Sequence, residues 1–161
     1  MEVKRIFDLL ELFKDDYKKK EIVFANKLAG KWRYVSANKY IEETKALAYG
    51  FLNLNLENNQ TVVTIIGNRP EWNIVDMALL RSGLWQVPVY PNISDDELLY
   101  IINHSETKLC IAENNEAYSK LKKAIVKTQK DIKLFCIENL NENCNLNKLF
   151  IYKPDNKLLE K

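Results

Sequence analysis

Loops that bind phosphate depend on glycine, and this sequence of 161 residues contains only Gly30, Gly50, Gly67 and Gly83. Such a loop needs close approach of the backbone to its ligand, which clustered glycines permit. Neither G-x-G-x-x-G nor G-x-x-x-x-G-K-[ST] occurs anywhere in the chain. We therefore expect no self-contained nucleotide site of either kind, and no cofactor bound by this chain alone.

Nucleophilic catalysis is also disfavoured by the sequence. His104 is the only histidine, and Ser105 follows it directly. A general base needs an orienting group and a nucleophile in the correct geometry, and adjacency in sequence does not supply either. His104 falls at the end of a predicted helix over 95–103, where the helix dipole favours a positive charge. We interpret it as a helix-terminal residue and predict no catalytic residue.

Metal binding is not predicted either. Asp95, Asp96 and Glu97 form an acidic cluster, but acids in the first turn of a helix are ordinary. Cys110, Cys136 and Cys144 are odd in number and lack C-x-x-C spacing, so they indicate neither a disulfide framework nor a zinc site. We interpret Cys110 and Cys136, which lie in apolar runs, as inert core thiols.

Composition limits the partners of the chain. It is 47% hydrophobic and 29% charged, as in soluble globular proteins, and its formal net charge is only +2. Nucleic-acid binders usually carry a one-sided basic field, so no nucleic acid partner is predicted. No apolar run approaches the ~20 residues of a membrane span, and the N-terminus lacks the apolar core of a signal peptide. We expect a cytoplasmic protein, with peripheral attachment to a membrane as an alternative.

The first 60 residues predict a helix, a hairpin and a second helix. Residues 1–20 form an amphipathic pattern with apolar side chains every three or four positions, which we expect to dock on the protein in preference to a partner or a membrane. Two short strands over 22–25 and 31–35 flank Gly30, with Trp32 and Tyr34 on one face. Ser36 is the predicted N-cap of the next helix. The apolar stripe of the first helix consists of Val3, Ile6, Leu9, Leu10, Phe13 and Tyr17.

From Thr61 onward, strands and helices alternate, which is typical of a mostly parallel sheet flanked by helices. Pro88 indicates an edge strand or a bend. Pro70 fits the first turn of a helix that Gly83 terminates, and Ser94 with Glu97 forms a capping box. The predicted strands are 61–66, 85–90, 107–112 and 132–137. We assign 21–138 to one α/β subdomain and 139–161 to an exposed, asparagine-rich connector with a short helical piece and an unpatterned end.

The turn Tyr90-Pro91-Asn92 is the best local candidate for a contact surface. It follows a predicted parallel strand, and ligands of open α/β sheets gather at the carboxyl ends of the strands. Proline and asparagine are also common turn formers, so a rigid strand-to-helix connection is the alternative interpretation.

Several motifs together resemble a known family. They are Asn68-Arg69-Pro70-Glu71-Trp72 after a strand, then Gly83, then Val87-Pro88-Val89-Tyr90-Pro91, then Ser94 and Glu97. In this order and spacing they resemble the N-terminal part of the AMP-forming acyl-CoA synthetases of the adenylate-forming superfamily, most of all bacterial long-chain fatty acid–CoA ligases. The resemblance covers about 22–112. Asn58-Asn59-Gln60 lacks the usual glycine, and Trp85-Gln86 replaces smaller residues.

The resemblance implies a two-step reaction for a longer parent protein. A fatty acid and ATP form an acyl-adenylate with the help of Mg²⁺, and CoA then displaces AMP. In the family, the phosphate loop, the adenine-binding segments and the catalytic lysine lie downstream of the matched stretch, so none is carried over. Residues 68–72 correspond to scaffold, and Tyr90, Pro91 and Asn92 to a turn near the CoA nucleotide.

We therefore expect the chain alone to be inactive, with the remainder of its own parent as its partner. A homodimer remains open, since the sequence shows no decisive patch. The competing hypothesis is a free-standing α/β binding or protein-interaction module without catalysis, because fold alone does not fix function.

Overall fold

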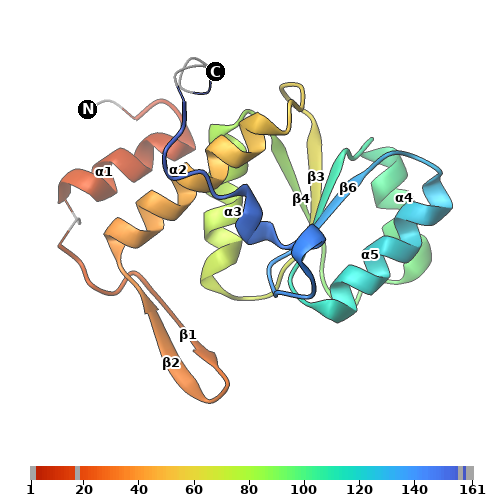
Figure 1. The fold of residues 1–161 in the computed structure, drawn as a ribbon, viewed down its shortest axis with the longest axis horizontal. Coiled ribbons are helices and arrows are strands. Elements are labelled where there is room, and N and C mark those ends of the chain that lie inside the picture. The colour runs from red at the N-terminus through yellow and green to blue at the C-terminus, as the bar shows by residue number, and fades with distance from the viewer. Residues whose placement is uncertain (1–2, 17–18, 156–157, 159–161) are drawn as a thin grey trace. The chain divides into compact units, whose positions relative to one another are not determined.

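The computed structural model describes residues 3–16, 19–155 and 158, without the side chains of 13–16 and 142 (Figure 1). Tyr17 and the Phe13 side chain of the predicted apolar stripe thus lie outside the described part. The chain divides into two compact units. The helix–hairpin unit comprises Met1–Leu54, Asn68–Ser82 and Leu149–Lys161. The sheet unit comprises Asn55–Gly67 and Gly83–Lys148, so the chain leaves it after Gly67 and returns at Gly83.

The sheet unit confirms the predicted α/β fold. Its four parallel strands lie in the order β4-β3-β5-β6, and helices α4 and α5 pack together beside it (Figure 1). Each strand is shorter than predicted, because the ladder stops where the chain turns. The elements are β3 (Thr61–Ile65), β4 (Trp85–Pro88), α4 (Asp95–His104), β5 (Leu109–Ala112), α5 (Asn115–Thr128) and β6 (Lys133–Cys136).

The core of the sheet unit follows from strand alternation. Val63 and Ile65 of β3 point to the same side and join one apolar cluster with Leu98 of α4 and Leu121 of α5. Val62, on the opposite side of β3, is equally inaccessible to water. A strand covered on both faces needs an unbroken apolar run, which explains the β-branched sequence from Thr61 onward.

Pro88 lies where its chemistry allows. It is the last residue of β4, which occupies an edge of the sheet, and it pairs in register with Thr64. Proline has no N–H to donate to a ladder, so an edge position is tolerated. Pairing then continues through Val89, whose N–H donates to the Thr64 carbonyl oxygen at 2.9 Å. The predicted edge strand is confirmed.

The helix boundaries follow predicted caps. The Ser36 hydroxyl accepts a hydrogen bond from the Lys39 N–H at 3.2 Å at the start of α2 (Ala37–Asn53). Ser94 and Glu97 form a complete capping box on α4. Pro70 is the first residue of α3 (Pro70–Arg81), where its missing N–H leaves no bond unmade.

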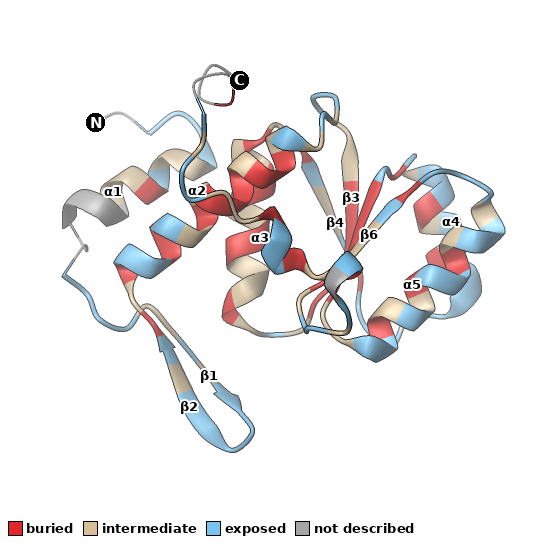
Figure 2. Cartoon of the chain, in the orientation of Figure 1, coloured by how far each residue is buried: buried red, intermediate tan, exposed pale blue. Residues whose placement is uncertain are grey.

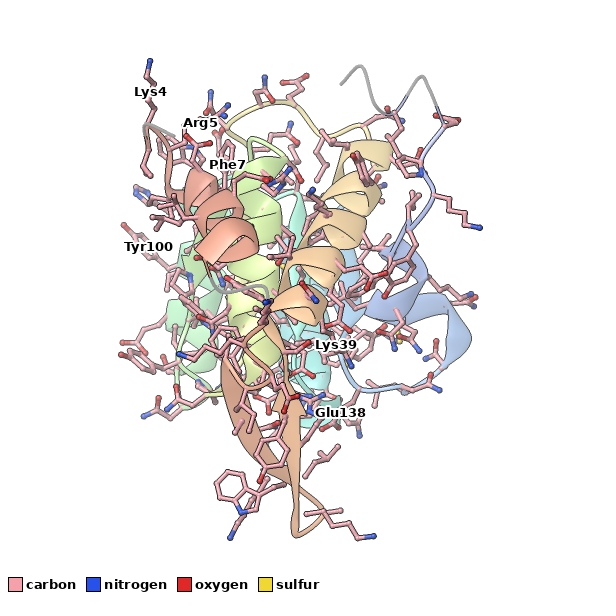
Figure 3. All side chains as sticks on the ribbon, turned by 90° about the vertical axis from the view of Figure 1, so that its left-hand side faces the viewer. Lys4, Arg5, Phe7, Lys39, Tyr100 and Glu138 are labelled. Carbon is pink, nitrogen blue, oxygen red and sulfur yellow. The ribbon has the colours of Figure 1, made fainter. Side chains whose placement is uncertain are left out.

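The N-terminal segment docks on its own unit, as predicted, but less completely. It consists of η1 (Ile6–Asp8) and α1 (Leu9–Asp16), which contact α3 and α2 respectively. Leu10 is fully buried, whereas Ile6 is 59% exposed, so the apolar stripe is only partly covered. The Arg5 guanidinium lies 4.5 Å from the centre of the Phe7 ring (Figure 3).

The predicted hairpin forms with its first strand shifted along the chain. The strands are β1 (Phe24–Leu28) and β2 (Lys31–Val35), in place of a first strand over 22–25. Ala29 and Gly30 both have positive φ, 48° and 80°, as a two-residue hairpin turn of this hand requires. The turn sets the register, and pairing extends from it to Phe24 opposite Val35.

The segment after Glu138 differs from the predicted exposed connector. Its asparagines are largely exposed, but Cys144, Leu146 and Leu149 are buried. They lie in two short turns, η2 (Glu142–Cys144) and η3 (Leu146–Leu149), the second close to the predicted helical piece. Apolar residues between the asparagines provide burial that a compositional argument overlooks.

Candidate functional site

The residues of the family motif are positioned by the start of α3. Arg69 is the N-cap residue, in an extended conformation, and Pro70 begins the helix. Glu71 accepts a bond from Arg69 Nε at 2.8 Å and pairs with Arg33 Nη1 of β2 at 2.6 Å. Arg33 Nε donates in turn to the Asn26 side chain of β1 at 3.0 Å. The motif thus ties the hairpin to α3.

The carboxylate at the centre of this cluster is held in its charged form. Burial by itself would raise the pKa of Glu71, but the hydrogen bonds from Arg33 and Arg69 outweigh it and lower the pKa to about 2. Two guanidinium groups share one carboxylate, and the Nη2 atom of Arg33 is buried without a hydrogen-bond partner. The arrangement is that of a structural ion cluster, which joins the hairpin to the start of α3.

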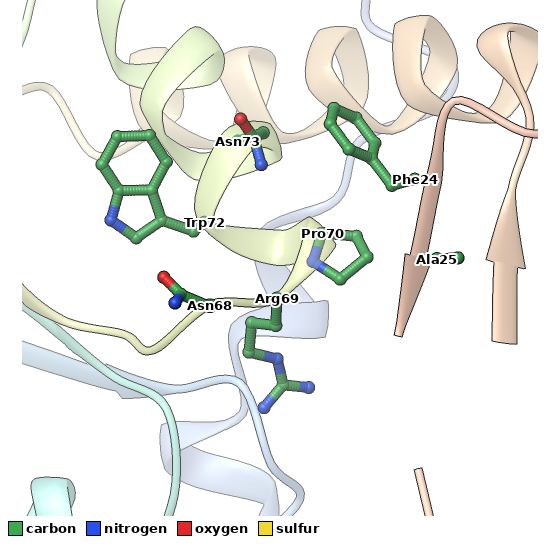
Figure 4. A pocket seen from close by; sticks show the side chains of 7 residues that line it. All are labelled: Phe24, Ala25, Asn68, Arg69, Pro70, Trp72 and Asn73. Carbon is green, nitrogen blue, oxygen red and sulfur yellow. The ribbon is translucent and has the colours of Figure 1, made fainter. Parts of the chain in front are cut away.

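A cleft of about 240 Å³ lies beside this cluster (Figure 4). Trp72 of α3 is half-buried and lines the cleft, whereas Val75 and Leu79 of the same helix are buried. The indole of Trp72 therefore belongs to the surface. The cleft is lined by Phe24, Ala25, Asn68, Arg69, Pro70, Trp72 and Asn73.

The second candidate region lies at the carboxyl ends of β3 and β5. The predicted contact turn is here: Tyr90 is 83% exposed, and Pro91 and Asn92 are exposed beside it. Lys120 of α5 donates hydrogen bonds from Nζ to the carbonyl oxygens of Pro91, at 3.3 Å, and Ile93. A small cavity of about 40 Å³ lies at this edge of the sheet. It is lined by Ile65, Pro91, Glu113, Asn114, Glu116, Ala117 and Lys120.

The turn after β3 is not arranged to hold phosphate. The Gly67 N–H donates to Oε2 of Glu113 at 2.6 Å, so a carboxylate already occupies that donor. The sheet unit has one other glycine, Gly83, in a positive-φ position after α3. At this turn the Gly67 N–H is therefore not available to a phosphate oxygen while Glu113 holds it.

His104 and Ser105 serve structure. The His104 ring is exposed and stacks on Tyr100 of the same helix, with centroids 5.3 Å apart. The Ser105 hydroxyl bonds to that of Thr107 at 2.6 Å, and its carbonyl accepts from the Thr61 hydroxyl at 2.6 Å. These bonds tie the end of α4 to the start of the sheet.

Glu97 of the acidic cluster has a capping role, and the three cysteines lie in the core. Glu97 is engaged in the capping box of α4. Within 3–16, 19–155 and 158, no cluster of three or more acidic, histidine or cysteine side chains could hold a metal ion. All three cysteines are buried, and burial raises the pKa of the Cys110 thiol to about 12. The predicted core position of Cys110 and Cys136 is confirmed.

Sequence reasoning missed Arg33, Glu113 and Lys120. Arg33 alternates with Trp32 and Tyr34 along β2, so an inward position could have been inferred from strand periodicity alone. Glu113 and Lys120 carry no local signal, because their partners lie 46 and 27 to 29 residues away in the chain.

A family model supports the resemblance noted in the sequence. Residues 13–154 match the AMP-binding enzyme family, and the chain belongs to that family. A long-chain-fatty-acid–CoA ligase of Xenopus laevis is 27% identical over 100 residues, covering 62% of this chain and 14% of the relative. A ligase of the same name from Mycobacterium bovis is 27% identical over 94 residues, covering 58% and 16%. The chain thus spans a small part of each relative.

Solved structures share the fold. A benzoate CoA ligase of Burkholderia xenovorans superimposes with a TM-score of 0.77, covering 91% of this chain and 28% of that one, at 12% identity. A protein from Rhodopseudomonas palustris described as a putative long-chain-fatty-acid CoA ligase gives 0.77, covering 94% and 37%, at 14% identity. At these identities the likeness establishes the α/β architecture alone.

Proposed function

We propose that this chain is the N-terminal portion of a long-chain fatty acid–CoA ligase that uses ATP, Mg²⁺ and CoA. The observation that carries the proposal is the family match over residues 13–154, together with the ligase relatives. Those relatives extend far beyond the aligned stretch, which leaves room for the ATP-binding and catalytic groups that this chain lacks. The role of the chain is then to provide scaffold.

Catalysis by the 161 residues alone is not expected. Adenylation depends on groups that position and neutralise the phosphates of ATP. In this chain Glu71 neutralises much of the charge of Arg33 and Arg69, and the unpartnered Nη2 atom of Arg33 is buried. The Gly67 N–H is occupied by Glu113.

The test compares the 161-residue chain with the protein encoded by the complete reading frame. We expect pyrophosphate release and acyl-CoA formation from a long-chain fatty acid, ATP and CoA only with the longer protein. Turnover by the short chain would contradict the scaffold role. A stop codon after Lys161 would instead support the binding-module hypothesis.

We further propose that Tyr90, Pro91 and Asn92 lie near the nucleotide of CoA in the parent enzyme. The 83% exposed Tyr90 ring offers a stacking surface at the carboxyl edge of the sheet, and Lys120 holds the turn in place. In the full-length enzyme, Tyr90→Ala should raise KM for CoA without changing adenylate formation. Tyr100→Ala, which removes an exposed ring from α4, is the matched control.

A further inference from the structure

The outer face of the hairpin carries two large aromatic rings that remain in contact with water. We define the hairpin outer face as Ala25 and Lys27 of β1 with Trp32 and Tyr34 of β2, which pair directly across the two strands. Trp32 is 57% exposed and Tyr34 is 53% exposed. Much of the hairpin of β1 and β2 has the pale blue colour of exposed residues (Figure 2). Their rings lie nearly parallel, with centroids 6.4 Å apart.

The opposite face of the same hairpin is occupied away from the tip, where only Leu28 and Lys31 are exposed. Arg33 is bound to Glu71, and Val35 is buried. Phe24 packs edge-on against Tyr40 of α2, with ring centroids 5.0 Å apart. The inner face thus accounts for the attachment of the hairpin to its unit. The contacts that attach the hairpin to the described part of its unit do not involve the rings of Trp32 and Tyr34.

Positive charge surrounds the outer face. The Lys27 ammonium lies 5.3 Å from the centre of the Trp32 ring. Lys31 alternates with Trp32 onto the opposite face of β2 but is exposed at the tip, next to the turn. Lys19 and Lys20 are exposed where the chain enters the hairpin. Between 19 and 35 the only acidic residue is Glu21. The chain as a whole carries a formal charge of only +2, so this cationic excess is local.

Indole and phenol rings next to lysines are the side chains that settle at the boundary between lipid headgroups and acyl chains. Each lysine near an anionic bilayer adds attraction. We propose that the hairpin outer face binds the surface of a membrane that contains anionic phospholipids. Trp32 and Tyr34 would enter the headgroup layer, and Lys27 and Lys31 would contact lipid phosphates and carboxylates.

Two features disfavour a protein partner. In a symmetric dimer through this face, Lys27 of one copy would approach the same positive patch of the other, which is repulsive. Stable protein interfaces also bury about 800 Å² on each partner, and four residues of a two-stranded hairpin present far less. A bilayer requires neither a matching shape nor a large area. Among the described residues no helix has the length and apolar character to cross a membrane, so the attachment proposed is at the surface.

The test measures binding of the 161-residue chain to vesicles of phosphatidylcholine with about 30 mol% phosphatidylserine, and to phosphatidylcholine alone. We expect binding only to the anionic vesicles, weakened by salt because the attraction is screened. Lys27→Glu with Lys31→Glu should weaken it about tenfold or more. Trp32→Ser with Tyr34→Ser should also weaken it. Equal binding to both vesicle types would overturn the proposal.

The matched control removes one exposed ring and two exposed lysines from the sheet unit, as Tyr100→Ser with Lys108→Glu and Lys133→Glu. This variant loses as much positive charge as Lys27→Glu with Lys31→Glu but should keep most of the binding. If it loses as much affinity as the hairpin variants, the attraction is a property of the whole surface, and the proposal fails.

A second measurement does not depend on weakened variants. Trp72→Phe with Trp85→Phe leaves Trp32 as the only tryptophan. Its fluorescence should shift to shorter wavelength on anionic vesicles and be quenched by brominated acyl chains. An unchanged spectrum with bound protein would overturn the proposal. So would a concentration-dependent dimer that is abolished by Trp32→Ser, since the face would then be a contact between two copies. Neither readout involves ligase activity, so the outcome is independent of the proposed function.

Discussion

The helices of the sheet unit pack on its strands through apolar side chains. The hairpin of the helix–hairpin unit is instead attached through a carboxylate shared by two guanidinium groups. In the sheet unit, Val63, Leu98 and Leu121 are buried together in one apolar cluster. In the other unit, Glu71 joins Arg33 and Arg69 at an interface that water still reaches. Stabilisation by apolar burial does not depend on the protonation of side chains. Stabilisation by an ion cluster depends on the protonation of its carboxylate and is partly screened by salt.

This difference can be measured unit by unit. All three cysteines lie in the sheet unit and are buried, so their reaction with a thiol reagent reports its opening. Denaturation by urea reports the chain as a whole. A change that loosens the hairpin should lower overall stability and leave the thiols protected, whereas a change in the sheet core should expose them.

The largest effect is expected from Leu121→Ala, which empties a fully buried position between α5 and the sheet. Leu-to-Ala changes in cores cost about 3 kcal/mol, through lost transfer free energy and the remaining cavity. Urea denaturation should show this loss, with faster thiol reaction. Val126→Ala, at a 70% exposed position of the same helix, is the control and should change stability little. Similar losses for the two variants would contradict the assigned core.

Gly50→Ala should destabilise the helix–hairpin unit by about 2 to 3 kcal/mol, although alanine is the better helix former. A Cβ at this position would lie 1.8 Å from the Leu149 carbonyl oxygen, and that backbone cannot move away cheaply. Gly67→Ala offers a comparison, because the nearest atom there is the flexible end of Glu113 at 2.9 Å, so a smaller loss is expected. Thermal unfolding of both variants measures the difference. A gain in stability for Gly50→Ala would show that Leu149 does not lie against Gly50.

Glu71→Gln should cost about 2 kcal/mol at neutral pH, between the values for exposed and buried ion pairs. Because the folded pKa of about 2 lies below the ordinary value of 4.5, ionised Glu71 stabilises the fold above that ordinary value. Its contribution is lost as the pH falls towards 2. The stability difference between wild type and variant should therefore shrink over this range in urea titrations.

The control for that change is Glu42→Gln, which removes an exposed carboxylate from α2. It should have little effect at any pH. Thiol reactivity should stay low in Glu71→Gln, since the sheet unit keeps its core. Rapid thiol reaction in this variant would show that loss of the ion cluster also destabilises the sheet unit, which would contradict the predicted difference between the units.

Ser94→Ala should have the smallest effect, a loss of about 1 kcal/mol, because the hydroxyl caps the Glu97 N–H at the start of α4. Ser119→Ala, at an exposed position inside α5, removes the same atom without a cap and should be neutral or slightly stabilising. Circular dichroism with thermal unfolding compares the two. An equal change in stability for the two variants would show that the capping box does not stabilise this unit.

The sequence predicted those features whose cause is local. Ser36, Pro70 and Ser94 begin helices because a cap or a proline at N1 acts within one turn. The β-branched run from Thr61 predicted a strand buried on both faces, since few other structures accept that composition. Strand limits were less well predicted, as with β1, because pairing with the neighbouring strand decides where a ladder stops.

The candidate site divides in the same way. Its turn, Tyr90-Pro91-Asn92, and its motif residues were found from sequence, since turn formers and motifs are read along the chain. Lys120 and Glu113 were not, because a hydrogen bond to a residue 27 or 46 positions away leaves no trace in local composition.

By itself, then, the sequence determined the order and type of the elements and the family. Only the tertiary structure decided that Arg33 and Arg69 share Glu71, that Leu149 lies against Gly50, and that Trp32 and Tyr34 face water. The physical reason is one of range. Backbone propensity and capping act over about four residues, whereas ion pairs, close packing and exposure depend on segments that only the folded chain brings together.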